Sequence, residues 1–212
     1  MKKYGVLLYT LLALLLVSAA VGISYAYMTA TVTINGDIKT TTLNTLNDLT
    51  VDFNTGAAFS INSALPISSS QVATSNHVGR VNFTVGNPST NVKALEYTLS
   101  LTDVDISSNL TAANKKFFRW QLLSSDNNGS SYSTVVAFGS FDGAVTGTDI
   151  NLTPTNITIA SGATNYYQFN VWLNDWEELD STKIGVDQST DFNNTYVKGK
   201  LKVTASPVAD NN

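Results

Sequence analysis

The stretch YYQFNVWL, residues 166–173, decides the fold class. Apolar residues stand at every second position from Tyr167 to Leu173, and Gln168 and Asn170 lie between them. Successive side chains of a β-strand point to opposite faces of the sheet, so this spacing predicts a strand. One of its faces is expected to be buried and the other to be wet.

The same alternation recurs in short runs after residue 26, bounded by turn-forming Gly, Asn, Asp and Ser. The run that ends at Asn35-Gly36 closes on a strong turn dipeptide. Short helical turns are expected only at Leu43–Asp48 and Trp176–Thr182. Eight or nine such strands predict an all-β fold, an antiparallel β-sandwich or jelly roll. The expected strands are residues 28–34, 49–53, 81–85, 95–101, 118–122, 135–141, 156–159, 167–173 and 197–203.

An apolar segment precedes the strands. Met1-Lys2-Lys3 is a short positive region, Val6–Ala26 is almost wholly apolar, and no charge follows until Asp37. Positive charge before an apolar run and none just after it keeps the N-terminus inside and sends the rest of the chain outward. The segment is therefore predicted to be an N-terminal apolar export helix.

The sequence allows two interpretations of this export segment. A signal peptide cut between Ala26 and Tyr27 fits the small-x-small pattern of Ser24-Tyr25-Ala26, and Ser18-Ala19-Ala20 offers a second site. An uncleaved anchor fits as well, because about 20 apolar residues can span a bilayer. A type IV prepilin is disfavoured, because Thr10 stands where such pilins usually carry Glu.

The expected domain organisation follows from that boundary. Residues 1–26 are a signal peptide or an N-terminal membrane anchor, and residues 27–212 form a single jelly-roll-like β-sandwich domain. A domain of this size can bury a hydrophobic core without disulfide bonds. The 212-residue chain has no cysteine, which excludes disulfides and thiol chemistry.

The low charge of the chain limits the classes of molecule that it can be expected to bind. Only 13% of the residues are charged, against roughly 25% in an average domain, and the net charge is −4. A nucleic-acid partner is excluded, because nucleic-acid binding needs a basic footprint. Polar surface must come instead from Ser, Thr and Asn, as suits extracellular β-proteins and fibre subunits.

The residues do not favour an enzyme. His77 is the single histidine and lies in a polar loop, so neither an HExxH zinc pair nor a histidine-rich metal site can form, and no G-x-S-x-G turn presents a serine nucleophile. The densest acidic patch runs from Asp175 to Asp191. Calcium prefers such oxygen clusters, but the spacing does not match an EF-hand, and a solvated acidic loop is the favoured interpretation. No catalytic residue, metal ligand or cofactor is assigned.

Both ends of the chain carry a family resemblance. Tyr25-Ala26-Tyr27-Met28-Thr29 after the export segment, residues 166–173, and Lys198-Gly-Lys-Leu-Lys-Val-Thr-Ala205 resemble the TasA/camelysin family of bacterial surface proteins, which has archaeal relatives. The resemblance implies a jelly roll, a dedicated signal peptidase, and assembly into extracellular matrix fibres, in some members by donor-strand exchange. Camelysin has been described as a metalloprotease, but this chain has no histidine cluster to support that activity.

The residues themselves also suggest how a filament would form. A cut after Ala26 would leave Tyr27–Ile34 as a free amphipathic strand. A donated strand gains main-chain hydrogen bonds while its alternate side chains fill apolar slots, and a head-to-tail contact propagates because it does not close. The alternative is that Tyr27–Ile34 is the first strand of its own sheet. The expected donor side chains are Met28, Ala30, Val32 and Ile34.

The expected function is therefore a structural subunit of an extracellular fibre or biofilm matrix. Its main partner would be other copies of itself, with residues 1–26 holding it to the membrane before or without cleavage. Its location would be secreted or at the cell surface. The alternative is a membrane-anchored surface ectodomain that acts as an adhesin or ligand-binding module, with Trp172 and Trp176 as exposed contact residues.

Overall fold

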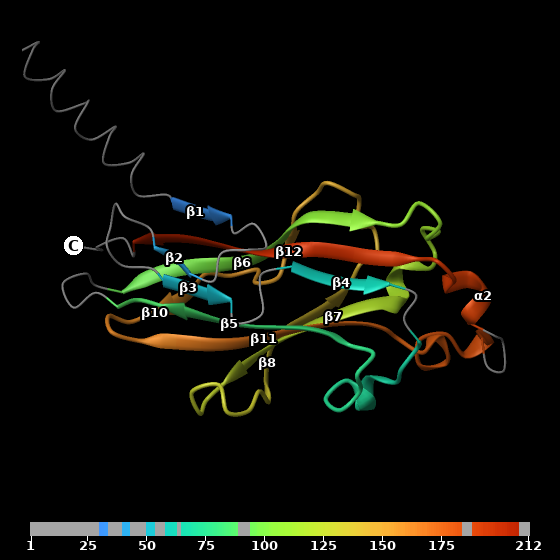
Figure 1. Ribbon diagram of the computed structural model, residues 1–212, viewed down its shortest axis with the longest axis horizontal. Coiled ribbons are helices and arrows are strands. Elements are labelled where there is room, and N and C mark those ends of the chain that lie inside the picture. The colour runs from blue at the N-terminus through green and yellow to red at the C-terminus, as the bar shows by residue number, and fades with distance from the viewer. Residues whose placement is uncertain are drawn as a thin grey trace, which may run out of the picture.

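The computed structural model describes residues 30–33, 40–42, 50–53, 58–62, 65–88, 94–183 and 188–207 (Figure 1). Its helical pieces are short: the 3₁₀ helices η1 (Ser69–Gln71), η2 (Lys115–Phe117), η3 (Trp176–Glu178) and η4 (Ser181–Lys183), and the helix α2 (Ser189–Phe192). The strands are β1 (Ala30–Thr33), β2 (Thr40–Thr42), β3 (Thr50–Phe53), β4 (Ala58–Asn62), β5 (Gly79–Gly86), β6 (Leu95–Ile106), β7 (Phe118–Ser125), β8 (Thr134–Ser140), β9 (Ile150–Asn151), β10 (Ile157–Ile159), β11 (Thr164–Leu173) and β12 (Tyr196–Pro207).

These strands form two sheets. Sheet A has the order β1-β12-β6-β10, with β4 also paired to β12 and β9 to β6. Sheet B has the order β2-β3-β5-β11-β7-β8. The ladders between the strands are all antiparallel. These two antiparallel sheets confirm the prediction of an all-β antiparallel sandwich.

The stretch that opened the sequence analysis lies at the centre of sheet B. Strand β11 pairs with β5 on one side and with β7 on the other, and Phe169 lies opposite Val81 and Leu122. Phe169 is fully buried, with its ring 5.2 Å from that of Phe59 on sheet A. The alternating face of β11 therefore supplies the middle of one core shared by both sheets.

A pair of tyrosines forms a polar link inside that core. The hydroxyl of Tyr97 on β6 is hydrogen-bonded to the hydroxyl of Tyr167 on β11, and Asn165 donates to Tyr97 Oη at 2.8 Å. Burial raises the pKa of both hydroxyls, so they stay protonated. The pair joins sheet A to sheet B without placing a charge in the core.

Most of the expected strands are found near their predicted positions. The structure adds β2, β4 and β9, which the sequence analysis missed; β2 and β9 span three and two residues. The helical turn expected at Trp176–Thr182 appears as η3 and η4. The turn expected at Leu43–Asp48 and the export helix lie outside the described residues. Within the described ranges, no helix has the length and hydropathy needed to cross a membrane.

Candidate functional site at the strand edges

The N-terminal strand lies at the edge of sheet A. Strand β1 pairs antiparallel with Lys202–Ala205 of β12, and β12 is its one strand neighbour among the described residues. Of the four expected donor residues, Ala30 lies opposite Ala205 and Val32 opposite Val203, whereas Met28 and Ile34 lie outside the described residues. The chain thus pairs this strand within its own sheet. If copies of the chain exchanged strands, this N-terminal strand would be the one to leave its own sheet.

Strand β12 shows what the N-terminal strand covers. Its outer edge is shared by two strands placed end to end, β4 on Tyr196–Lys200 and β1 on Lys202–Ala205. Val203 and Ala205 are buried in the core on this half of β12. Removing β1 would therefore open a backbone edge directly beside core side chains, which is the geometry that an added strand needs.

On the solvent face of sheet A, three lysines of β12 form ion pairs with aspartates. Lys198 Nζ lies 3.0 Å from Asp105, Lys200 Nζ 2.8 Å from Asp103, and Lys202 Nζ 2.9 Å from Asp149, each measured to a carboxylate oxygen. The hydrogen bond from Lys202 lowers the pKa of Asp149. Each of these lysines therefore has a carboxylate partner within its own chain.

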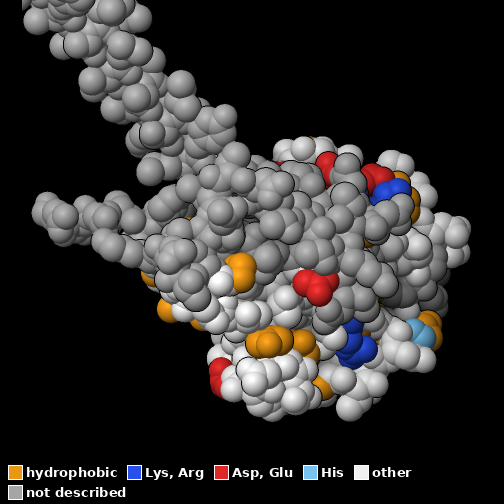
Figure 2. All heavy atoms as spheres, turned by 60° about the vertical axis from the view of Figure 1, so that its left-hand side comes forward, with side chains coloured by type: hydrophobic (Ala, Val, Ile, Leu, Met, Phe, Trp, Pro, Cys, Tyr) orange, Lys and Arg blue, Asp and Glu red, His pale blue; other side chains and the backbone are white. Residues whose placement is uncertain are grey.

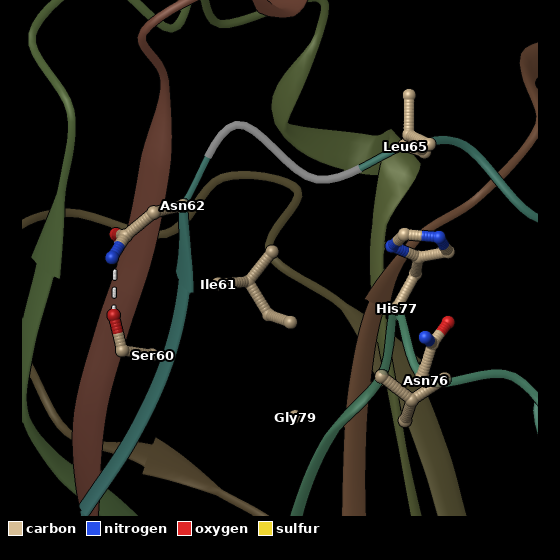
Figure 3. Close-up of a pocket in the computed structure, with 8 residues that line it drawn as sticks. Ser60, Ile61, Asn62, Leu65, Asn76, His77 and Gly79 are labelled. Atoms are coloured by element: carbon tan, nitrogen blue, oxygen red, sulfur yellow. Dashed lines mark hydrogen bonds between the residues drawn. The ribbon is translucent and has the colours of Figure 1, made fainter.

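The single histidine lines an open pocket of about 390 Å³ between β4 and the loop before β5. Figure 3 shows Ile61 on β4 directed toward His77 and Leu65, while Ser60 and Asn62 lie on the far side of the strand. The Ser60 hydroxyl donates to Asn62 at 3.2 Å, and among the described residues no hydrogen bond joins Ser60 to His77. This arrangement presents no activated nucleophile.

The acidic segment binds its own chain. Glu178 accepts hydrogen bonds from the backbone N–H of Ser69 at 3.0 Å and from its hydroxyl at 2.9 Å, and from the amide of the buried Asn174 at 3.0 Å. Asp175 caps η3 by accepting from the Glu177 N–H, and Asp180 accepts from Thr182. Asp187 lies outside the described residues. Within the ranges that the structure covers, no three His, Cys, Asp or Glu side chains are grouped to hold a metal ion.

Glu178 is expected to make the fold sensitive to acid. Burial alone would raise its pKa, but the hydrogen bonds from Ser69 and Asn174 outweigh burial and lower the pKa below the ordinary 4.5. A pKa lowered by folding means stability that is present above pH 4.5 and is lost as the pH falls through the folded-state pKa. Urea unfolding at decreasing pH should show Glu178→Gln less stable than the parent chain at neutral pH, with the gap closing in acid.

The matched control for Glu178 is the exposed carboxylate of Asp142, replaced by Asn. Its stability profile is expected to run parallel to that of the parent chain. If the difference between the parent and Glu178→Gln stayed constant down to roughly pH 3, the proposed role of this carboxylate would be wrong.

The two tryptophans expected as exposed contact residues are buried, which corrects that expectation. Trp172 points to the outer face of sheet B, but the loop 65–78 covers it with Ile67, Val72 and Val78, and its indole N–H donates to Asn174 at 2.9 Å. Trp176 packs edge-on against Phe117, and the centroids of the two rings are 6.2 Å apart. A loop distant in sequence hides Trp172, and no local pattern signals that cover.

Three of the exposed large apolar residues lie instead on β8, the edge strand of sheet B, whereas Leu65, Val145 and Leu179 lie singly in loops. Val135, Val136 and Phe138 are 55%, 37% and 70% exposed. Beside β8 runs the seam between the two sheets, here named the β8 seam, with hollows of about 490 and 260 Å³ that share Val136. Figure 2 shows hydrophobic side chains in small groups among mostly uncharged polar ones. The seam is lined by Trp120, Val135, Val136, Ala137, Phe138, Leu152, Pro154 and Ile157.

Comparisons with known proteins identify no family. No family model matches the chain, and no curated protein matches it. Among solved structures, a similar chain is the K3 cleaved adhesin domain of Lys-gingipain from Porphyromonas gingivalis, with 10% identity and a TM-score of 0.32 over 84% of this chain and 99% of that one. This likeness is too distant to carry an argument about function.

Proposed function

We propose that the protein is a structural subunit of an extracellular fibre or matrix, joined to the next copy by its N-terminal strand. The observation that carries the proposal is the place of β1, a four-residue edge strand that follows closely on the expected cut after Ala26. An edge strand is the element that a chain can give to a neighbour without opening the rest of its core.

Donation keeps the contacts that the single chain already makes. When β1 leaves its own β12, the vacated edge at Lys202–Ala205 accepts the β1 of another copy in the same register. Exchange of an identical element between protomers costs little, because the lost and gained contacts match. When each copy gives its strand to one neighbour and receives a strand from another, the contact runs head to tail and extends into a filament.

The export segment would control this step. Until the cut after Ala26, residues 1–26 hold the strand to the membrane, and afterwards the strand is free to pair elsewhere. A secreted or cell-surface location, the jelly-roll form of the sandwich, membership of a TasA/camelysin-like group and the lack of a catalytic role all belong to this proposal.

Negative-stain electron microscopy of the purified chain Tyr27–Asn212 tests the proposal. Filaments are expected from this cut chain, and dispersed or membrane-bound particles from a chain that keeps residues 1–26. If the cut chain stayed monomeric at every concentration, the proposal would fail. The alternative function, a membrane-anchored surface ectodomain, would then be favoured.

A further inference from the structure

Strand β8 has an edge without the usual protection against pairing. Its seven residues, Thr134–Ser140, contain no charge and no proline, and β7 is its one strand partner among the described residues. Edge strands commonly carry Lys or Pro, which discourage another chain from adding on. The bulge opposite Leu122–Leu123 is the one such device that β8 has.

The strand packs closely on β7 and exposes apolar side chains that an added chain would cover. Gly139 lies against the indole of Trp120 so closely that a Cβ there would be 2.6 Å from Trp120 Cζ2. Trp120 is buried and stacks on Phe169, and its indole N–H has no hydrogen-bond partner among the described groups. A chain laid along the β8 seam would cover the exposed side chains of Val136 and Phe138.

Charge at the two ends of β8 selects the occupant. Asp126 accepts a hydrogen bond from Thr134 at one end of the strand, and Asp142 follows Ser140 at the other. Antiparallel pairing of β8 with another β8 would place the carboxylates of the two copies near each other, and like charges repel. The complementary partner is an uncharged strand with a positive group at its end.

The N-terminal edge strand fits that description. From Tyr27 to Gly36 the chain has no charged side chain, and the expected cut after Ala26 would place an ammonium on Tyr27. The described part of that segment, β1, has four residues and would pair with part of the seven-residue β8. In Figure 1 β1 and β8 lie on opposite sides of the sandwich, so a contact between them joins different molecules.

We propose that the outer edge of β8 pairs with the outer edge of β1 on the sheet A of a second copy. The inference rests on the proposed function and adds a contact to strand donation. Among the described residues β12 is the one strand that pairs with β1, so the other edge of β1 can take an added strand whether β1 is its own or a donated strand. The contact joins two different surfaces, so it does not close, and it associates filaments sideways.

Single-cysteine cross-linking tests this contact, because the chain has no cysteine of its own. The variants are Phe138→Cys on β8, Thr31→Cys and Thr33→Cys on β1, and Val145→Cys, an exposed apolar residue off β8 (58%), as the matched control. Each is made in the Tyr27–Asn212 chain, mixed in pairs of different tag size, and treated with a short bismaleimide. The Phe138 variant is expected to link to a β1 variant several-fold more than the Val145 variant does.

Four results have separate meanings. Cross-linking of Phe138→Cys mainly to itself would overturn the inference in favour of β8–β8 pairing, and cross-linking no stronger than that of Val145→Cys would overturn it outright. Filaments that form without the cross-link would leave the proposed function standing, whereas cross-linked oligomers without filaments would remove that function and keep the contact. In the filaments, Phe138→Lys should reduce lateral bundling several-fold and Val145→Lys should not.

Discussion

Replacing Phe169 by alanine is expected to lower the free energy of unfolding by about 3–5 kcal/mol, enough to unfold much of a marginal domain. The side chain is fully buried at the centre of β11, with its ring 5.2 Å from Phe59 and 6.4 Å from Trp120. Its loss removes apolar burial and leaves a cavity between the sheets. Urea unfolding followed by tryptophan fluorescence measures the change.

The control is the same substitution at Phe138, whose side chain is 70% exposed on β8. There the expected change is within about 0.5 kcal/mol, because a surface side chain away from caps and networks contributes little. Equal losses at the two positions would contradict the placement of β11 at the centre of the core.

Locking β1 to its own β12 is expected to abolish filament assembly. Thr31 lies directly opposite Thr204, and opposed residues of an antiparallel pair have Cα atoms about 4.5–5.5 Å apart, which suits a disulfide. In a chain with no other cysteine, Thr31→Cys with Thr204→Cys can form only this bond within one molecule. The oxidised chain Tyr27–Asn212 should stay monomeric, and the same sample after reduction should form filaments.

The reduced sample is the internal control for the lock, and Thr204→Cys alone controls for the loss of the threonine. Sedimentation and negative-stain microscopy report assembly in each form. Filaments from the fully oxidised double variant, in the same amount as from the reduced one and with every chain running as a monomer on a non-reducing gel, would show that β1 does not leave its sheet.

The sandwich could be predicted because its long strands carry apolar residues at every second position, and these residues face the core. The other face of β11 was expected to be wet, but Asn170 and Trp172 on that face are buried. Residues 95–101 and 167–173 alternate regularly, and the structure has both as central strands of a sheet. Strands β2 and β9 could not be found this way, because three threonines and the pair Ile150-Asn151 have no alternation to read. Pairing with β3 and β6 makes them strands.

The strand edges were beyond prediction for a different reason. The Val135–Phe141 run was expected as a strand, but its place at the rim of sheet B depends on β7 being its one strand partner among the described residues. Glu178 was visible as an acidic residue, yet its partner Ser69 lies 109 residues away in sequence. The cover over Trp172 comes from the loop 65–78. Such contacts are set by tertiary packing, which one-dimensional periodicity does not record.

Immunolabelled electron microscopy of material shed from the native cell surface tests the central claim most directly, that this chain builds extracellular filaments. Filaments that bind an antibody raised against residues 27–212, with subunits whose first residue is Tyr27, are the predicted result. Dispersed particles, or protein that stays with the membrane and keeps residues 1–26, would contradict it.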